Sequence, residues 1–222
     1  MVDIIFPKSA QKYMGLQCNS VITDYTQCPE LSSIENIIAN LAPKNVLEIG
    51  AGLGRISVFI NRKYQWGSTN FFLLDGNSGD TQIAGLHENV GKDFYNSLDA
   101  TKEFCIKNGI DSSRLKIINA ETKIDLNDLQ FDLCYSFKAM GFHWPINWHL
   151  NKLYAHILPE SYLFFEIRDT RRESYPTEKH WKRRMAFVKK QLDEIDPAKY
   201  TIIKSETNRT FPILVLKRNN DS

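Results

Sequence analysis

The chain has 222 residues, of which 42% are hydrophobic, 24% charged and 12% aromatic, and its formal net charge is +2. These proportions are typical of a folded domain and exclude an intrinsically disordered chain. No apolar run reaches the roughly 18 residues that a membrane-spanning helix needs, so we expect no membrane partner. The first residues lack the pattern of a secretory signal, and we expect a cytoplasmic location.

The cysteines give no sign of a metal or redox centre. They lie far apart and form no Cys-x-x-Cys pair and no cluster with histidine: Cys18, Cys28, Cys105 and Cys134. We therefore predict ordinary thiols and no metal site.

Residues 1–30 precede the first periodic segment, and we interpret them as a lid or cap over the ligand. Residues 31–222 are predicted to form a single domain, because the remaining length leaves little room for a second core. The first predicted helix carries apolar residues from Leu31 to Leu41, and Pro43 ends it.

The most specific pattern is the run VLEIGAGLGR at residues 46–55. Its apolar start predicts a buried strand, and its end predicts the start of a helix with one buried face. Between them, Gly50, Gly52 and Gly54 allow a sharp turn and a close approach of the backbone to a ligand. Arg55 stands where a dinucleotide-binding fingerprint has its third glycine, so the spacing disfavours a dinucleotide.

This E-x-G-x-G-x-G pattern resembles motif I of the class I S-adenosylmethionine-dependent methyltransferases. The resemblance implies that the loop binds S-adenosyl-L-methionine and that the product is S-adenosyl-L-homocysteine. It assigns these residues to the cofactor: Glu48, Gly50, Ala51, Gly52 and Gly54. An incidental glycine turn is the alternative interpretation.

A second predicted strand, over residues 70–75, ends in a carboxylate about twenty residues beyond the glycines. An ionised Asp75 at that position accepts hydrogen bonds from both hydroxyls of a ribose, and Gly76 follows it in the predicted cofactor site. An aspartate that only serves a turn is the alternative. Residues 76–96 have no clean period, so we predict a loop insertion near the active site.

The third predicted strand covers residues 114–119. In the methyltransferase family the residues that end this strand flank the adenine, which here implies Asn119, Ala120 and Glu121. The side-chain amide of Asn119 both donates and accepts hydrogen bonds, as an adenine edge requires. An asparagine that closes a strand is also ordinary turn chemistry.

The fourth predicted strand, over residues 130–137, leads into the loop KAMGFHWP. In the family fold this loop faces the methyl donor, and we assign Ser136 at the strand end to the cofactor site. His143 is the candidate general base, because histidine titrates near neutral pH. A histidine packed between aromatic side chains is the alternative. We expect the acceptor to contact a cationic and aromatic wall: Lys138, Phe142, Trp144 and Arg168.

The remaining pattern completes an alternating fold. Apolar stripes predict further helices at residues 98–108, 146–157 and 181–195. A strand is predicted at residues 162–168, and two β-rich runs at 200–207 and 211–218 predict a hairpin. We therefore predict an α/β fold with a doubly wound, mostly parallel seven-stranded sheet, an antiparallel C-terminal hairpin strand and helices on both faces. The class I methyltransferases share this arrangement.

Residues 168–190 carry nine Lys or Arg and three Asp or Glu. Two interpretations stay open for this basic segment. It binds an anionic acceptor or RNA, or it is a solvated helix face.

These features predict an enzyme, an S-adenosylmethionine-dependent methyltransferase. We expect metal-independent O-methylation of a small molecule by in-line transfer, the acceptor being a sugar, a glycoconjugate precursor or a secondary metabolite. Metal-dependent family members carry an aspartate where this chain has Ser136. No nucleic-acid partner is expected, and a homodimer stays open. The alternatives are an RNA methyltransferase, an aminopropyl transferase and a non-catalytic nucleoside-binding or interaction protein with this fold.

Overall fold

The computed structural model describes most of the chain, in the ranges 4–11, 21–22, 31, 34–77, 97–120, 122, 126, 128–137, 139, 146–167, 178–206 and 213–221. The chain divides into two compact units, Met1–Asp125 and Leu126–Ser222. None of the helices in these ranges is long and apolar enough to cross a membrane.

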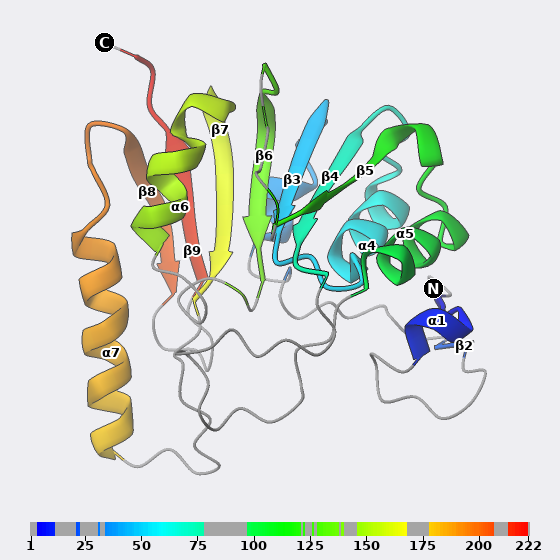
Figure 1. Cartoon of the computed structure of the whole chain (residues 1–222). Helices are drawn as coiled ribbons and strands as arrows, with labels where there is room; N and C mark the ends of the chain where they lie inside the picture. Colours follow the sequence, from blue (N-terminus) through cyan, green and yellow to red (C-terminus); the bar gives the residue numbers. More distant parts are fainter. Residues whose placement is uncertain are drawn as a thin grey trace. The chain divides into compact units, whose positions relative to one another are not determined.

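Seven strands form a mostly parallel sheet in the order β5-β4-β3-β6-β7-β9-β8, which confirms the predicted fold class. Figure 1 labels the strands along the chain. Their bounds are β3 Asn45–Ile49, β4 Asn70–Asp75, β5 Leu115–Asn119, β6 Phe131–Ser136, β7 Ile157–Glu166, β8 Tyr200–Glu206 and β9 Ile213–Arg218.

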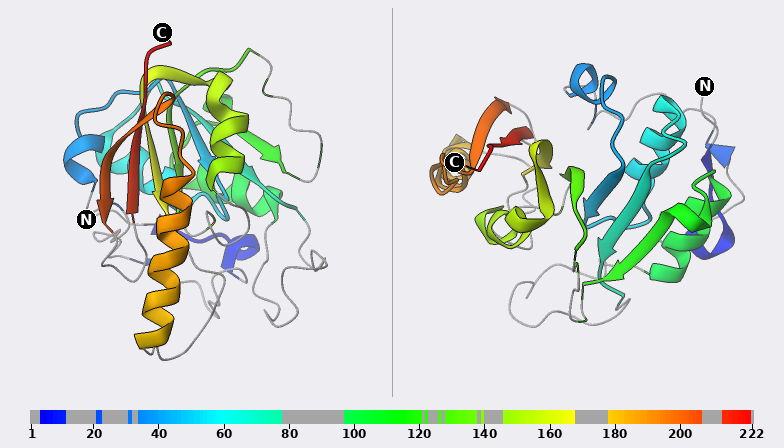
Figure 2. Two further views of the ribbon diagram at one scale, coloured as in Figure 1. Left: turned by 90° about the vertical axis from the view of Figure 1, so that its left-hand side faces the viewer. Right: turned by 90° about the horizontal axis from the view of Figure 1, so that it is seen from above.

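In the first unit, β3, β4 and β5 pair in parallel. β3 and β4 bury almost every side chain, as is usual for parallel strands covered on both faces. The helices α4 (Arg55–Tyr64) and α5 (Leu98–Lys107) contact each other, and α5 also contacts β5. The right-hand view of Figure 2 shows both helices on the same side of the three strands. The carboxyl ends of these strands therefore meet at one edge, beside the start of α4.

The described part of the N-terminal segment lies against α5. β1 (Ile4–Ile5) pairs antiparallel with β2 (Val21–Ile22), and α1 (Lys8–Gln11) contacts α5. The side-chain amide of Asn108 accepts the N–H of Ile5 at 2.8 Å and donates to its carbonyl at 2.7 Å. Asn108 thus satisfies both backbone polar groups of Ile5, as a neighbouring strand would. A lid formed by residues 1–30 stays a prediction.

The first predicted helix is only partly helical in the described residues. Leu31 is helical, Ile34 lies in a turn, and α3 spans Glu35–Ile38. The stripe residues Leu31, Ile34 and Ile38 are all buried, as predicted for a helix with one buried face.

In the second unit, β6 and β7 pair in parallel, and β9 pairs antiparallel with both β7 and β8. β8 and β9 form the predicted C-terminal hairpin. The helices of this unit are α6 (Ile146–Leu153) and α7 (Glu178–Asp193).

The start of β7 differs from the prediction. The helix expected to reach residue 157 ends at Leu153, and after a short 3-10 turn β7 begins at Ile157 rather than at Tyr162. Phe131 of β6 pairs with Ile157, but Leu133 pairs with Tyr162. The turn-like residues 159–161 are therefore a bulge inside the strand, which is a position that tolerates proline and the φ of 66° at Glu160.

Candidate functional site

The glycine loop joins β3 to α4 at the carboxyl edge of the first unit. Gly50, Gly52 and Gly54 all have left-handed backbone conformations, with φ of 67°, 54° and 74°. Only glycine adopts such conformations without steric cost. The N–H groups of Gly50 and Ala51 both donate to the carbonyl of Leu74, at 2.8 and 3.2 Å. The loop is thus fixed to the end of β4.

The second and third glycines serve different purposes. A Cβ on Gly54 would lie 2.6 Å from the Cys105 sulfur and 2.8 Å from Cδ1 of Leu73, so this glycine lets α5 and β4 pack closely against the loop. A Cβ on Gly52 would meet no atom of the described residues within 4 Å. Of these two positions, Gly52 is therefore the one where a ligand has room to approach the backbone.

Asp75 lies directly beside Gly52. One carboxylate oxygen accepts the N–H of Gly52 at 2.5 Å, and the other accepts the N–H of Gly76 at 2.7 Å. A carboxylate has about four acceptor positions on two oxygens and can therefore accept more than two hydrogen bonds. The structure therefore brings together three of the predicted cofactor residues at the point where the loop is open.

Glu48 is buried in β3, with 3% of its surface exposed, and its Oε2 accepts a hydrogen bond from the hydroxyl of Ser57 at 2.5 Å. Burial raises the pKa of the Glu48 carboxyl to about 8, because the charged form is poorly solvated there. This side chain is thus mostly protonated at neutral pH. It links β3 to α4 under the loop, and its predicted contact with the cofactor stays a prediction.

Asn119 and Ala120 lie next to Asp75 on the neighbouring strand. Asp75 and Asn119 are register partners in the β4–β5 pair, and the N–H of Ala120 donates to the carbonyl of Asp75 at 2.8 Å. The sheet therefore places the predicted adenine and ribose residues side by side. Glu121 lies outside the described residues.

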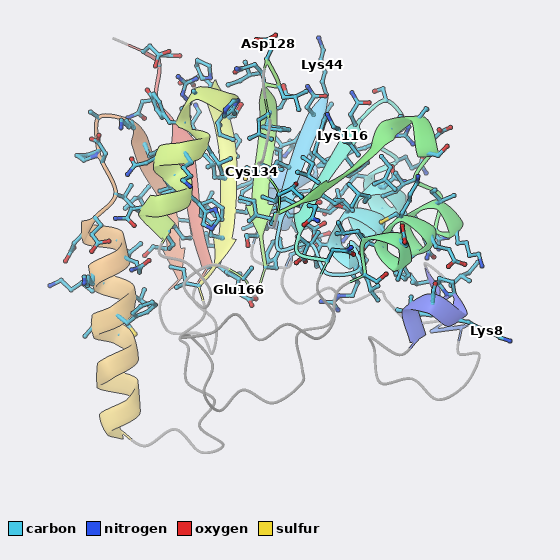
Figure 3. The ribbon with its side chains drawn as sticks, viewed as in Figure 1. Lys8, Lys44, Lys116, Asp128, Cys134 and Glu166 are labelled. Atoms are coloured by element: carbon cyan, nitrogen blue, oxygen red, sulfur yellow. The ribbon has the colours of Figure 1, made fainter. Side chains whose placement is uncertain are left out.

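In the second unit, two buried polar side chains stand at the carboxyl ends of β6 and β7. Ser136 is fully buried, and its hydroxyl has no hydrogen-bond partner in the part of the chain that the structure describes. Glu166 is 3% exposed and ends the parallel neighbour β7. Figure 3 shows Glu166 at the end toward which these strands run and Asp128 at the opposite end.

The predicted general base and the predicted acceptor residues lie outside the described part of the chain. They are His143, Lys138, Phe142, Trp144 and Arg168. Among the residues that are described, no group of three or more His, Cys, Asp or Glu side chains is arranged to hold a metal ion.

No protein-family model matches the sequence, and no curated protein matches it. Solved structures are similar to it in fold. A protein from Staphylococcus aureus, provisionally named as a caffeoyl-CoA O-methyltransferase, has a TM-score of 0.58 and 12% identity, over 87% of this chain and 84% of its own. A protein from Clostridium thermocellum, provisionally named as an rRNA methylase, has a TM-score of 0.55 and 12% identity, over 87% and 97%. A ribosomal protein L11 methylase from Lactobacillus delbrueckii subsp. bulgaricus has a TM-score of 0.52 and 17% identity, over 86% and 77%.

The chain has the class I methyltransferase fold. Within this methyltransferase fold, two contacts of the glycine loop escaped the sequence analysis. Thr101 Oγ1 donates to the carbonyl of Gly52 at 2.6 Å, and the Cys105 sulfur lies 3.6 Å from the carbonyl of Leu53. Both residues come from α5, where they were interpreted only as part of an apolar stripe. The available signal was a polar threonine at a buried stripe position. The sequence analysis also assigned no role to Glu166, although a charged residue within an apolar strand is a signal of a polar site.

Proposed function

We propose that this protein is a methyltransferase that uses S-adenosyl-L-methionine to methylate an oxygen of a small molecule. The observation that carries the proposal is the pairing of Gly52 with Asp75, where an open stretch of loop backbone adjoins a carboxylate at the carboxyl end of a parallel strand. Ligands of open α/β sheets bind at this edge. The donor set fits a ribonucleoside, because a carboxylate accepts both ribose hydroxyls and an amide matches the adenine edge.

The residues of the first unit would bind and orient this cofactor. Asp75 would hold the ribose, and Asn119 with Ala120 would flank the adenine. The glycine loop would lie against the methionine part, and Glu48 beneath it would keep the loop in position. When bound, the cofactor supplies an electrophilic methyl group on a sulfonium. The contribution of these residues is to hold that group in line with an acceptor, which is worth several kcal/mol.

The acceptor would be an alcohol of a sugar, a glycoconjugate precursor or a secondary metabolite. An alcohol is a weak nucleophile until it loses its proton, so a general base raises the rate by about 10²- to 10⁴-fold. His143 is the proposed base. Ser136 keeps its predicted place in the cofactor site, and the buried Glu166 side chain is a polar group suited to bind an acceptor hydroxyl. No step of this scheme uses a metal.

The test is calorimetric titration of S-adenosyl-L-methionine and S-adenosyl-L-homocysteine into the natural chain, Asp75→Ala and Asp111→Ala. Asp111 is the matched control, because its exposed carboxylate also accepts a backbone N–H, from Ser113 at 2.8 Å. Loss of the ribose contacts should weaken binding to Asp75→Ala at least tenfold, since a hydrogen bond to a charged group contributes about 1.5–3 kcal/mol. Asp111→Ala should bind as the natural chain does. Equal binding by all three proteins would remove the ribose assignment.

Two further results separate the alternatives. Tight cofactor binding without methyl transfer to any of a panel of small alcohols and sugars would favour a non-catalytic nucleoside-binding protein. RNA binding that weakens steeply with salt would favour an RNA methyltransferase.

A further inference from the structure

The helix α5 is bonded to the glycine loop through the carbonyl of Gly52. Thr101 is 1% exposed, and its hydroxyl donates toward the Gly52 carbonyl at 2.6 Å and toward the Ser97 carbonyl, one helical turn back, at 3.2 Å. A hydroxyl donates a single hydrogen. The shorter contact is the one to the loop, so the Gly52 carbonyl is the stronger acceptor, and the longer contact is the bond to its own helix that threonine commonly makes.

Gly52 is consequently fixed at both of its backbone polar groups. Its N–H donates to Asp75 and its carbonyl accepts from Thr101. Glycine has the widest conformational freedom of any residue, and ordering one residue costs about 1–2 kcal/mol of entropy. If the loop is already ordered, ligand binding does not have to order Gly52, and this loss of entropy does not reduce the affinity.

α5 is itself anchored near the same edge. The N–H of Leu98 donates to the side chain of Asn77 at 3.0 Å, two residues beyond Asp75, and Ser97 caps the helix through the N–H of Ala100. One turn after Thr101, the Cys105 sulfur occupies the space behind Gly54. The helix therefore presents two residues of one face to consecutive parts of the loop. Its register against the loop is fixed at several points.

We propose that Thr101 is a positioning residue for the cofactor site, which acts by holding Gly52 in the conformation that meets the ligand. This inference rests on the proposed function. Thr101 does not need to touch the cofactor. It fixes the backbone of Gly52, which lies beside the ribose residue Asp75 of the proposed site.

The chain offers a closely matched control. Thr69 is 2% exposed, and its hydroxyl donates to the carbonyl of Pro43 at 2.6 Å, in the same unit but at the start of β4. Thr69→Val and Thr101→Val thus remove the same group, at the same burial and hydrogen-bond length. Only the second bond reaches the glycine loop.

The experiment measures the affinity for S-adenosyl-L-homocysteine by calorimetry, and amide hydrogen exchange over residues 50–55, for the natural chain, Thr101→Val, Thr101→Ser and Thr69→Val. We expect Thr101→Val to bind about tenfold more weakly and to exchange faster in this segment, since one ordered residue corresponds to roughly that factor. Thr101→Ser retains the hydroxyl and should stay within about threefold of the natural chain, as should Thr69→Val. Thermal unfolding of both valine variants reports their stability loss independently.

The outcomes are distinguishable. Equal affinity of Thr101→Val and the natural chain overturns the positioning role and leaves the proposed function standing. Equal weakening by Thr69→Val and Thr101→Val also overturns it, because the effect would then be general destabilisation. Failure of the natural chain to bind the nucleoside overturns both the proposed function and this inference.

Discussion

Replacement of Glu48 by glutamine should make the protein more stable than the natural chain at alkaline pH. The natural carboxyl is buried and its pKa is raised from an ordinary 4.5 to about 8, chiefly by desolvation. The folded state therefore favours the neutral acid, while the unfolded chain ionises at its ordinary pKa. The stability that the neutral acid contributes is fully present below pH 4.5 and is lost as the pH rises to about 8. Glutamine stays neutral and keeps an oxygen that accepts from Ser57.

The size of the effect follows from the two pKa values. The interval from 4.5 to about 8 is about 3.5, and at 1.36 kcal/mol for each pKa unit it gives about 5 kcal/mol as an upper value. The unfolding free energies of Glu48→Gln and the natural chain should be close at about pH 5 and should separate by up to this amount near about pH 9. Relaxation of the folded state around the charge would reduce the gap to a few kcal/mol.

Urea unfolding followed by circular dichroism at a series of pH values measures this separation. Glu103→Gln is the contrasting control, because Lys107 and Ser9 lower the pKa of that exposed carboxyl. The pH dependence of stability has the opposite sign at Glu103. A lowered pKa contributes stability that is present above the ordinary pKa and is lost as the pH falls. Parallel pH profiles for the natural chain and Glu48→Gln would refute the buried-acid reasoning, and so would greater stability of the natural chain near about pH 9.

Three further outcomes follow from the geometry. Gly54→Ala should lower the free energy of unfolding by about 2–4 kcal/mol in urea, because of overpacking and a left-handed backbone. Gly52→Ala should lower it by only about 1–2 kcal/mol and yet weaken nucleoside binding in calorimetry. The reverse ranking of stability would contradict the packing argument. Ser136→Ala should change the free energy of unfolding by less than about 1 kcal/mol, because the buried hydroxyl has no partner in the described chain. The same variant should lower the rate of methyl transfer. A large loss of stability would show that the hydroxyl is structural. His143→Ala should lower turnover by about 10²- to 10⁴-fold with cofactor affinity nearly unchanged, and a collapse of affinity would refute its role as the base.

The strand, glycine loop and helix of the first unit were predictable because their signals are local. The run over residues 46–55 begins with the apolar residues of a buried strand and leads into the apolar spacing of a helix. Its glycines are needed for backbone conformations that other residues rarely adopt. The placement of Asp75 and Asn119 at one edge of the sheet was also predictable, because parallel strands bring their carboxyl ends to a common edge. Their adjacency in register is a property of the sheet that the sequence analysis did not specify.

The parts that were missed depend on contacts distant in sequence. Thr101 bonds to a carbonyl 49 positions away, and although its polar side chain in an apolar stripe marked it, no local pattern indicates that partner. The start of β7 was misplaced for a related reason. Residues 159–161 have turn chemistry, but pairing with β6 and β9 keeps the surrounding chain extended, and the extra residues bulge. Local preference was overridden by pairing with neighbouring strands.

The unequal surroundings of the two glycines have an evolutionary consequence. Gly54 is held by the core, because α5 and β4 fill the space that a side chain would need. At Gly52 the described residues leave space for a side chain, and glycine is favoured by the left-handed backbone and, in the proposed function, by the bound ligand. Under the proposed function, a descendant that no longer bound the cofactor would tolerate substitutions at Gly52 better than at Gly54. Variation at the second glycine, with the third retained, is therefore the expected sign of a relative that has lost cofactor binding.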